Sequence, residues 1–186
     1  AINQAYNDNR IIGVISQRDN EVESPTINDL FSIGTVARIV KLLRMPDGTI
    51  TAILQGRKRM KLLEILSDTP YLSGQVQLLD YISPKDSLEF EALISSVLDL
   101  ARQIIELSPN IPSEANHMLR NINSKGFLLN FIASNMGLEV RMKQRLLEMG
   151  DLKEKANLIL ENMDSELQLL ELKDQIESKV RTDIEK

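Results

Sequence analysis

The stretch from Gly34 to Leu66 constrains the fold of this chain more than any other part of the sequence. Its apolar residues recur at alternate positions, which predicts β-strands, and in the first run they occupy both parities, which suits a strand of a small barrel or sandwich. Between the runs, Pro46, Asp47 and Gly48 are the residue types of a tight hairpin turn, and Gly56 interrupts the returning run. The stretch therefore predicts three strands in an antiparallel meander that bends at Gly56.

The segments beside this stretch complete a β-rich first half. Residues 1–10 have the spacing of a short helix, and residues 11–15 form an apolar strand. Residues 18–29 are polar and acidic around a proline, which predicts a loop. Residues 72–81 alternate apolar and polar side chains and predict one more strand, so the β-rich half ends near Tyr81.

The second half is predicted to be a helical bundle. Ser83, Pro84 and Asp86 together form a helix-start signature, Ser113 is a candidate cap for a short helix, and Asp151 can cap the last helix. Apolar residues at spacings of three and four predict helices over residues 84–107, 113–121, 124–136, 138–149 and 151–186. In the third of these helices, Phe127, Leu128, Phe131 and Ile132 are expected to face inward. The last helix is longer than a small domain is wide, so its end is expected to project.

Composition excludes several classes of protein. The 186 residues are 42% hydrophobic and 26% charged, which is typical of a soluble folded chain, and the formal net charge of −5 argues against nucleic acid as the default partner. The chain has no Cys, so disulfides and thiolate metal sites are excluded. We expect no membrane segment and a cytoplasmic location. Neither end carries a start or stop signal, so we expect a fragment of a longer protein.

Several sequence blocks resemble the N-terminal domain of bacterial Lon proteases. The most specific are GTVARI, which begins at Gly34, and PDGT, which begins at Pro46, in that order. Further blocks extend the resemblance over essentially the whole chain: IIGVISQRD (11–19), PTINDLFS (25–32), QGRKRMKLLEI (55–65), PYLSGQV (70–76), SPNIP (108–112), FLLNFIASNM (127–136), KQRLLE (143–148) and LELKDQIESKV (170–180).

The resemblance implies an α+β fold in three parts. Residues 1–82 would form a PUA-like β-barrel that lacks its first hairpin and has an open edge, which another chain could cover. Residues 83–150 would form an α-helical bundle, and residues 151–186 one long projecting helix that leads to an ATPase and a Ser-Lys peptidase, both absent here. The phosphate-binding motif G-x-x-x-x-G-K-[ST] does not occur in the chain. We therefore expect no catalytic, cofactor or metal site in this fragment, whereas the parent protein would use ATP and Mg²⁺.

The stretch from Gly34 to Leu66 is also basic, with seven basic residues against Asp47 and Glu64. The basic residues are Arg38, Lys41, Arg44, Arg57, Lys58, Arg59 and Lys61. A nucleic-acid-binding surface is one interpretation, but the stretch has no aromatic side chain on which a base could stack. A solvated basic face is the favoured alternative.

The candidates for substrate contact come from the helical half, which holds five of the seven methionines. Flexible thioethers can form an adaptable surface for unfolded chains, or they can fill a Leu-rich core. For Met136 and Met149 the core is the favoured interpretation, whereas Met142 and Met163 suit either role equally. The candidate substrate-binding residues are Met142, Leu146, Met149 and Met163. His117, the only histidine, is expected to be a solvated helix residue.

The resemblance implies a non-catalytic region of a Lon protease that recognises unfolded or damaged proteins during quality control and the stress response. It would also support assembly of a ring, which the resemblance implies is a homohexamer of an AAA+ serine protease. One alternative is a purely structural module whose long helices pair with those of neighbouring subunits. A nucleic-acid-binding barrel is the other alternative.

Overall fold

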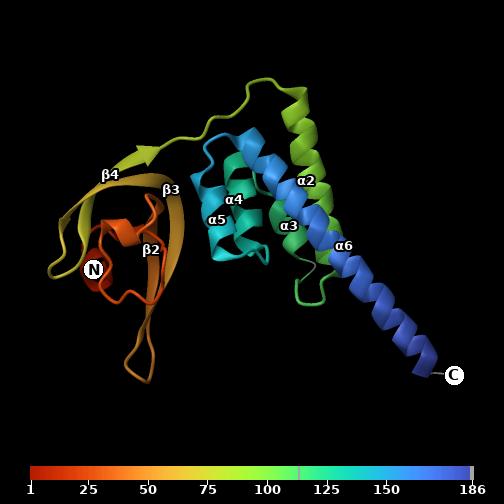
Figure 1. Ribbon diagram of the computed structural model, residues 1–186, viewed down its shortest axis with the longest axis horizontal. Coiled ribbons are helices and arrows are strands. Elements are labelled where there is room, and N and C mark those ends of the chain that lie inside the picture. Colours follow the sequence, from red (N-terminus) through yellow and green to blue (C-terminus); the bar gives the residue numbers. More distant parts are fainter. Residues whose placement is uncertain (113, 185–186) are drawn as a thin grey trace. The chain divides into compact units, whose positions relative to one another are not determined.

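The computed structural model describes residues 1–112 and 114–184, and the chain divides into two compact units, Ala1–Asp80 and Tyr81–Lys186 (Figure 1). The first unit contains a sheet and the second contains helices, so the α+β class is confirmed. The predicted cap at Ser113 lies outside the described residues. The predicted division into three domains stays a prediction.

The first unit is a four-stranded antiparallel sheet in the order β1-β2-β3-β4. Its elements, in chain order, are α1 (Ile2–Asn7), β1 (Ile11–Val14), the 3-10 helix η1 (Ile27–Asp29), β2 (Ile33–Arg44), β3 (Ile50–Ser67) and β4 (Ser73–Leu79). The stretch from Gly34 to Leu66 therefore holds parts of two strands, and the prediction of three was wrong. The two edge strands of this sheet are β1 and β4.

Gly56 does not end a strand. Val36 pairs with Lys58 and Ala37 pairs with Gly56, so Arg57 is an extra residue in β3 at this point of the ladder. Such a bulge bends a strand and increases its twist without breaking it. The bend predicted at Gly56 is thus a bulge inside one strand of 18 residues.

The turn between β2 and β3 has the chemistry that the sequence predicts. The backbone N–H of Gly48 donates to the Met45 carbonyl at 3.0 Å, and Gly48 has a φ of 86°. Residues with a Cβ rarely adopt that angle. An Asp47 carboxylate oxygen accepts from the N–H of Thr49 at 2.9 Å and from its hydroxyl at 2.7 Å. These bonds lower the pKa of Asp47 below its ordinary value, with the Thr49 hydroxyl as the largest cause.

The predicted PUA-like β-barrel, which was expected to have an open edge, is observed as an open sheet that does not close into a barrel. In the part of the chain that the structure describes, β1 pairs only with β2 and β4 pairs only with β3, so the sheet stays open. Closure requires the two edge strands to pair with each other or with further strands. The buried apolar residues of this unit are Leu30, Ala37, Ile39 and Met60. The PUA-like relationship is not confirmed by this open sheet.

The second unit contains five helices among the described residues (Figure 1). They are α2 (Leu88–Leu107), α3 (Ala115–Arg120), α4 (Lys125–Asn135), α5 (Val140–Glu148) and α6 (Leu152–Ile184). The helical bundle and the single long last helix are confirmed. Figure 1 shows α6, in blue, extending well past the other helices of its unit.

Two helix starts were predicted correctly and one was not. Ser124 accepts from the N–H of Phe127 at 3.3 Å, and Asp151 accepts from the N–H groups of Lys153 and Glu154 at 2.8 and 3.1 Å. The helix expected to begin at Pro84 begins instead at Leu88, where the Ser87 hydroxyl caps it. Asp86, the acidic residue of the predicted helix-start signature, has a φ of 48°, which is incompatible with a right-handed helix.

The core of the second unit is a continuous apolar cluster from all five helices. Its buried members are Phe90, Ile94, Val97, Ala101, Ile104, Leu119, Leu128, Leu129, Ile132, Ala133, Met136, Leu146, Leu152, Ala156, Ile159, Met163 and Leu167. Leu128, Ile132 and Met136 were predicted correctly. Phe127 was not, because it is 52% exposed and stacks on Phe131 with ring centroids 6.4 Å apart. The side chain that takes the inward position is Leu129, which is fully buried.

A polar cluster lies inside this apolar core. The Lys155 ammonium is completely buried and donates to Asn130 Oδ1 at 2.8 Å and to Tyr81 Oη at 3.2 Å. Asn130 Nδ2 also donates to Tyr81 Oη at 2.8 Å, and the Lys155 Nζ atom lies 4.5 Å from the centre of the Tyr81 ring. These contacts join the start of the unit to α4 and α6. A buried charge must be hydrogen-bonded in this way to be tolerated.

Candidate functional site

The four predicted substrate-contact residues do not share one exposed surface. Leu146 and Met163 are 2% and 1% exposed and belong to the core of the helical unit. Met142 in α5 and Met149 at its C-terminal end are half-buried. In this structure only Met142 and Met149 offer area that a substrate chain could reach, and the substrate role of all four residues stays a prediction. His117 is exposed on α3, as expected.

An apolar row runs along the second half of α6. Leu169, Leu172, Ile176 and Val180 are each 52% or 53% exposed and recur at spacings of three, four and four. At about 100° per residue, this row is rotated roughly 120° from the buried stripe that includes Ala156 in the first half of the same helix. From Glu171 to Arg181 every side chain is exposed. The helix therefore carries two apolar faces, and among the described residues only the first is covered.

The sheet unit also exposes many large apolar side chains. Leu66, Leu78 and Val40 are 66%, 54% and 50% exposed. Further members, each at least 36% exposed, are Ile11, Val14, Ile27, Leu43, Met45, Ile50, Ile53, Leu54, Leu63, Leu72 and Val76. Single exposed apolar residues are normal, but so many on a unit of this size indicate an interaction surface.

The basic residues of β2 and β3 are mostly solvated, as the favoured interpretation predicted. Arg59 is the exception, because it is 5% exposed and its Nη2 donates to the Asp80 carbonyl at 2.9 Å. Its neighbour Lys58 forms an ion pair with the Asp80 carboxylate at 2.7 Å, which lowers the pKa of Asp80. Arg59 is therefore a structural residue, and Lys58 is partly neutralised. Both facts weaken the nucleic-acid interpretation.

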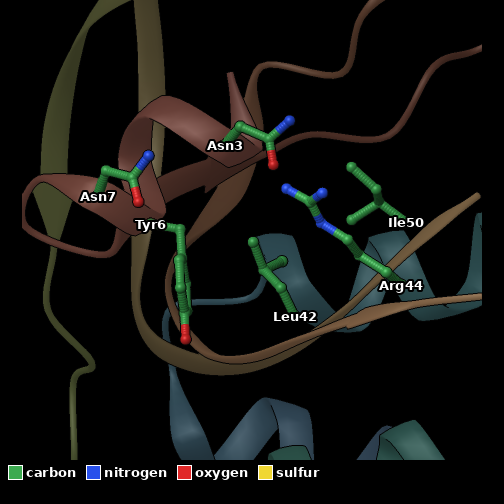
Figure 2. Close-up of a pocket in the computed structure, with 6 residues that line it drawn as sticks. All are labelled: Asn3, Tyr6, Asn7, Leu42, Arg44 and Ile50. Atoms are coloured by element: carbon green, nitrogen blue, oxygen red, sulfur yellow. The ribbon is translucent and has the colours of Figure 1, made fainter.

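A pocket of about 500 Å³ lies between α1 and the β2–β3 hairpin (Figure 2). Its lining residues are Asn3, Tyr6, Asn7, Leu42, Arg44 and Ile50. In Figure 2 the Arg44 guanidinium points toward the Asn3 amide, and the Tyr6 ring forms one wall. Arg10 stacks on that ring at 4.6 Å. This pocket could not be predicted from local sequence patterns, since its residues come from two segments that only the fold brings together.

The described residues offer neither a candidate metal site nor a candidate membrane-spanning helix. Among the described residues, no three or more His, Cys, Asp or Glu side chains gather where they could hold a metal ion. Within the same part of the chain, no helix is both long enough and apolar enough to cross a membrane.

Two solved structures share this fold. The N-terminal domain of a Lon protease from the Mycobacterium avium complex matches with a TM-score of 0.62 at 15% identity, over 82% of this chain and 90% of that one. A Lon N-terminal domain protein from Xanthomonas campestris matches with a TM-score of 0.57 at 16% identity, over 86% of this chain and 79% of that one. At these identities the likeness defines a class of fold: a small sheet unit followed by helices.

Sequence comparison then identifies the family. The ATP-dependent protease La (LON) substrate-binding domain matches residues 1–165. A Lon protease of Flavobacterium johnsoniae is 49% identical, and one of Cytophaga hutchinsonii is 40% identical, each over 99% of this chain. The chain belongs to the Lon substrate-binding domain family. It spans about 23% of the length of each of these two relatives.

Proposed function

We propose that this chain is the non-catalytic region of a Lon protease that recognises unfolded or damaged protein substrates. The observation that carries the proposal is the family match over residues 1–165, because that family is described as substrate-binding. The exposed apolar side chains of the sheet unit support it physically, since unfolded proteins differ from folded ones chiefly in the apolar area that they expose.

The proposed parent supplies the chemistry. Since the chain spans about 23% of its relatives, hydrolysis of ATP with Mg²⁺ and cleavage by a Ser-Lys peptidase belong, in this proposal, to other parts of a cytoplasmic AAA+ protease of the stress response. A half-exposed Leu or Val contributes on the order of 1 kcal/mol when it is covered, so each contact with substrate is weak. Several copies around a hexameric ring would add affinity through effective concentration.

Binding of fluorescently labelled casein, a largely unfolded protein, tests the proposal. Anisotropy would be measured as the 186-residue chain is added, with labelled native lysozyme, a folded protein, as the matched control. We expect saturable binding of casein and at least about tenfold weaker binding of the folded control, because a folded protein has already buried its apolar residues. Equal affinity for the two proteins would refute the proposal.

Assembly is a second proposed function, favoured by the apolar row of Leu169, Leu172, Ile176 and Val180 on α6. A helix that presents such a row gains stability by packing against an equivalent row. Covering four half-exposed side chains on each of two helices would contribute several kcal/mol, on the order of 1 kcal/mol per residue. In this proposal the second half of α6 pairs with a neighbouring subunit and supports the ring.

Sedimentation velocity over a range of concentrations tests the assembly role. Leu172→Lys with Ile176→Lys should abolish concentration-dependent self-association, since two lysines then interrupt the row. Gln175→Lys with Ser178→Lys is the matched control, because it also replaces two exposed uncharged residues of the helix by lysine, at positions outside the row. If both pairs of substitutions behave alike, or if the unchanged chain stays monomeric at every concentration, the row has no role in assembly.

A further inference from the structure

The chain passes from the sheet unit to the helical unit between two anchored residues. The sheet unit ends at Asp80, whose carbonyl accepts from Arg59 Nη2 at 2.9 Å and whose carboxylate pairs with Lys58 at 2.7 Å. The helical unit begins at the next residue, Tyr81, which belongs to the polar cluster inside that unit. While these contacts hold, one peptide bond joins the two units, and it separates consecutive Cα atoms by about 3.8 Å.

Tyr81 and Ile82 are attached to the helical unit through main-chain as well as side-chain contacts. The N–H of Ile82 donates to the Gly150 carbonyl at 2.9 Å, and the Ile82 carbonyl accepts from the N–H of Leu152 at 2.9 Å. The two bonds form a short parallel bridge at the start of α6. Residues 83–87, which follow, belong to no helix or strand. Tyr81 and Ile82 are therefore a strap, an attached segment that precedes an irregular one.

The contacts of the strap are of a kind that water can replace. The Ile82 side chain is 67% exposed, so its docking buries little apolar area. The Lys155 Nζ atom lies 4.5 Å from the centre of the Tyr81 ring, and the Tyr81 hydroxyl accepts from Lys155 and Asn130. A buried ammonium has lost its hydration shell, and water that enters when Tyr81 leaves restores part of that hydration. Release of the strap therefore costs less than withdrawal of a core side chain such as Phe90.

We propose that the strap is a releasable latch that sets the length of the connection between the two units. Attached, it leaves one peptide bond between anchored residues. Released, residues 81–87 form a connector that spans up to roughly 20 Å. Release is a local unfolding event in which the core helices stay folded, so the sheet unit gains reach while the helical unit remains intact. The inference goes beyond the proposed function, since it does not depend on which molecule the chain binds.

Native-state hydrogen exchange of the unchanged chain tests whether the strap opens on its own. The reporters are the amides of Ile82 and Leu152, and the reference is the amide of Ile159, a fully buried residue of α6. We expect the reporters to exchange at least about 100-fold faster than the reference, with little dependence on urea, because local opening exposes little surface. One common rate and urea dependence for all three amides would mean that the strap opens only when the helical unit unfolds, which overturns the inference.

Spin labels measure the length of the connection directly. The chain has no Cys, so Thr51→Cys in β3 and Glu161→Cys in α6 place one label at an exposed position of each unit. Tyr81→Ala removes the ring and hydroxyl of the strap, and it should extend the longest label-to-label distances in double electron–electron resonance by at least about 10 Å. Ser83→Ala, the matched control, shortens an exposed side chain just beyond the strap and should leave the distances unchanged.

Circular dichroism would establish that the helices of both variants are folded. Equal distance distributions in folded Tyr81→Ala and Ser83→Ala would overturn the inference, because the connection would then keep its length without the latch. If Tyr81→Ala does not fold, the exchange rates of the unchanged chain decide the question, since they require no substitution.

Discussion

Removing the Tyr81 hydroxyl tests whether the buried polar cluster stabilises the helical unit. In Tyr81→Phe the ring remains, so the apolar packing and the contact of Lys155 with the ring face are kept. The oxygen that accepts from Lys155 Nζ at 3.2 Å and from Asn130 Nδ2 at 2.8 Å is lost. Lys155 is completely buried, so its lost hydrogen bond is not simply replaced by a bond to water, whereas Asn130 is partly buried.

The size of the effect follows from the type of bond that is lost. A bond from a charged donor contributes about 1.5 to 3 kcal/mol, and one from a neutral donor about 1 kcal/mol. The bond from Lys155 is long at 3.2 Å, and Lys155 keeps its shorter bond to Asn130 at 2.8 Å. We therefore expect the lower part of the summed range, a loss of about 2.5 kcal/mol in the free energy of unfolding of the helical unit.

Urea unfolding followed by circular dichroism at 222 nm measures this loss, because the helices dominate that signal. Replacing the buried ammonium as well, in Tyr81→Phe with Lys155→Met, removes the donor that Tyr81→Phe deprives of an acceptor. A thioether side chain of similar length can fill the same space, so the double variant should be more stable than the sum of the two single losses. The cluster would contribute little to stability if Tyr81→Phe lowered the free energy of unfolding by less than about 0.5 kcal/mol. The same would follow if the loss in the double variant equalled the sum of the two single losses.

Three further outcomes are expected. Ser87→Ala should destabilise the helical unit by about 1 kcal/mol and Ser83→Ala by much less, because only Ser87 caps α2; equal losses in urea unfolding would contradict this assignment. Gly48→Ala should destabilise the sheet unit by about 1 kcal/mol, measured by thermal unfolding, because φ is 86° there. The hydrogen bonds from Thr49 lower the pKa of Asp47 below 3.8 in the folded state, so the ionised carboxylate stabilises the fold above pH 3.8 and this stabilisation is lost as the pH falls through the folded pKa. NMR titration of the Asp47 carboxyl should give a midpoint below 3.8, and Thr49→Val should raise that midpoint.

Features decided by neighbouring residues could be predicted from the sequence. The turn at Asp47 and Gly48 depends on a side chain that bonds backbone two residues on and on a residue that accepts positive φ. The helix start at Ser124 and the cap at Asp151 depend on bonds to the first turn of the same helix. Family membership was also predicted from local blocks, since GTVARI and PDGT occur in a fixed order.

Features decided by distant contacts could not be predicted in the same way. Gly56 has the same local signature in a strand break and in a bulge, and only pairing with Ala37 decides between them. The segment GFLLNFIA of α4 is apolar nearly all round, so its sequence does not fix which face packs inward. In the structure Leu129 is buried and Phe127 is exposed. The same limitation applies to Leu146 and Met163, because a thioether or leucine suited to substrate contact is equally suited to a core.

The two apolar faces of α6 have a mechanical consequence for any partner that the exposed row binds. The helix has 33 residues and spans about 50 Å without a break. Leu152, Ala156, Ile159, Met163 and Leu167 anchor its first half in the core of the helical unit. Withdrawing even one large member of this set would cost on the order of 2 to 5 kcal/mol. A force that displaces the second half of α6 must therefore move the whole helical unit, because pulling α6 out of the core would cost more. A partner bound at Leu172 and Ile176 would thus control the position of this unit as one body.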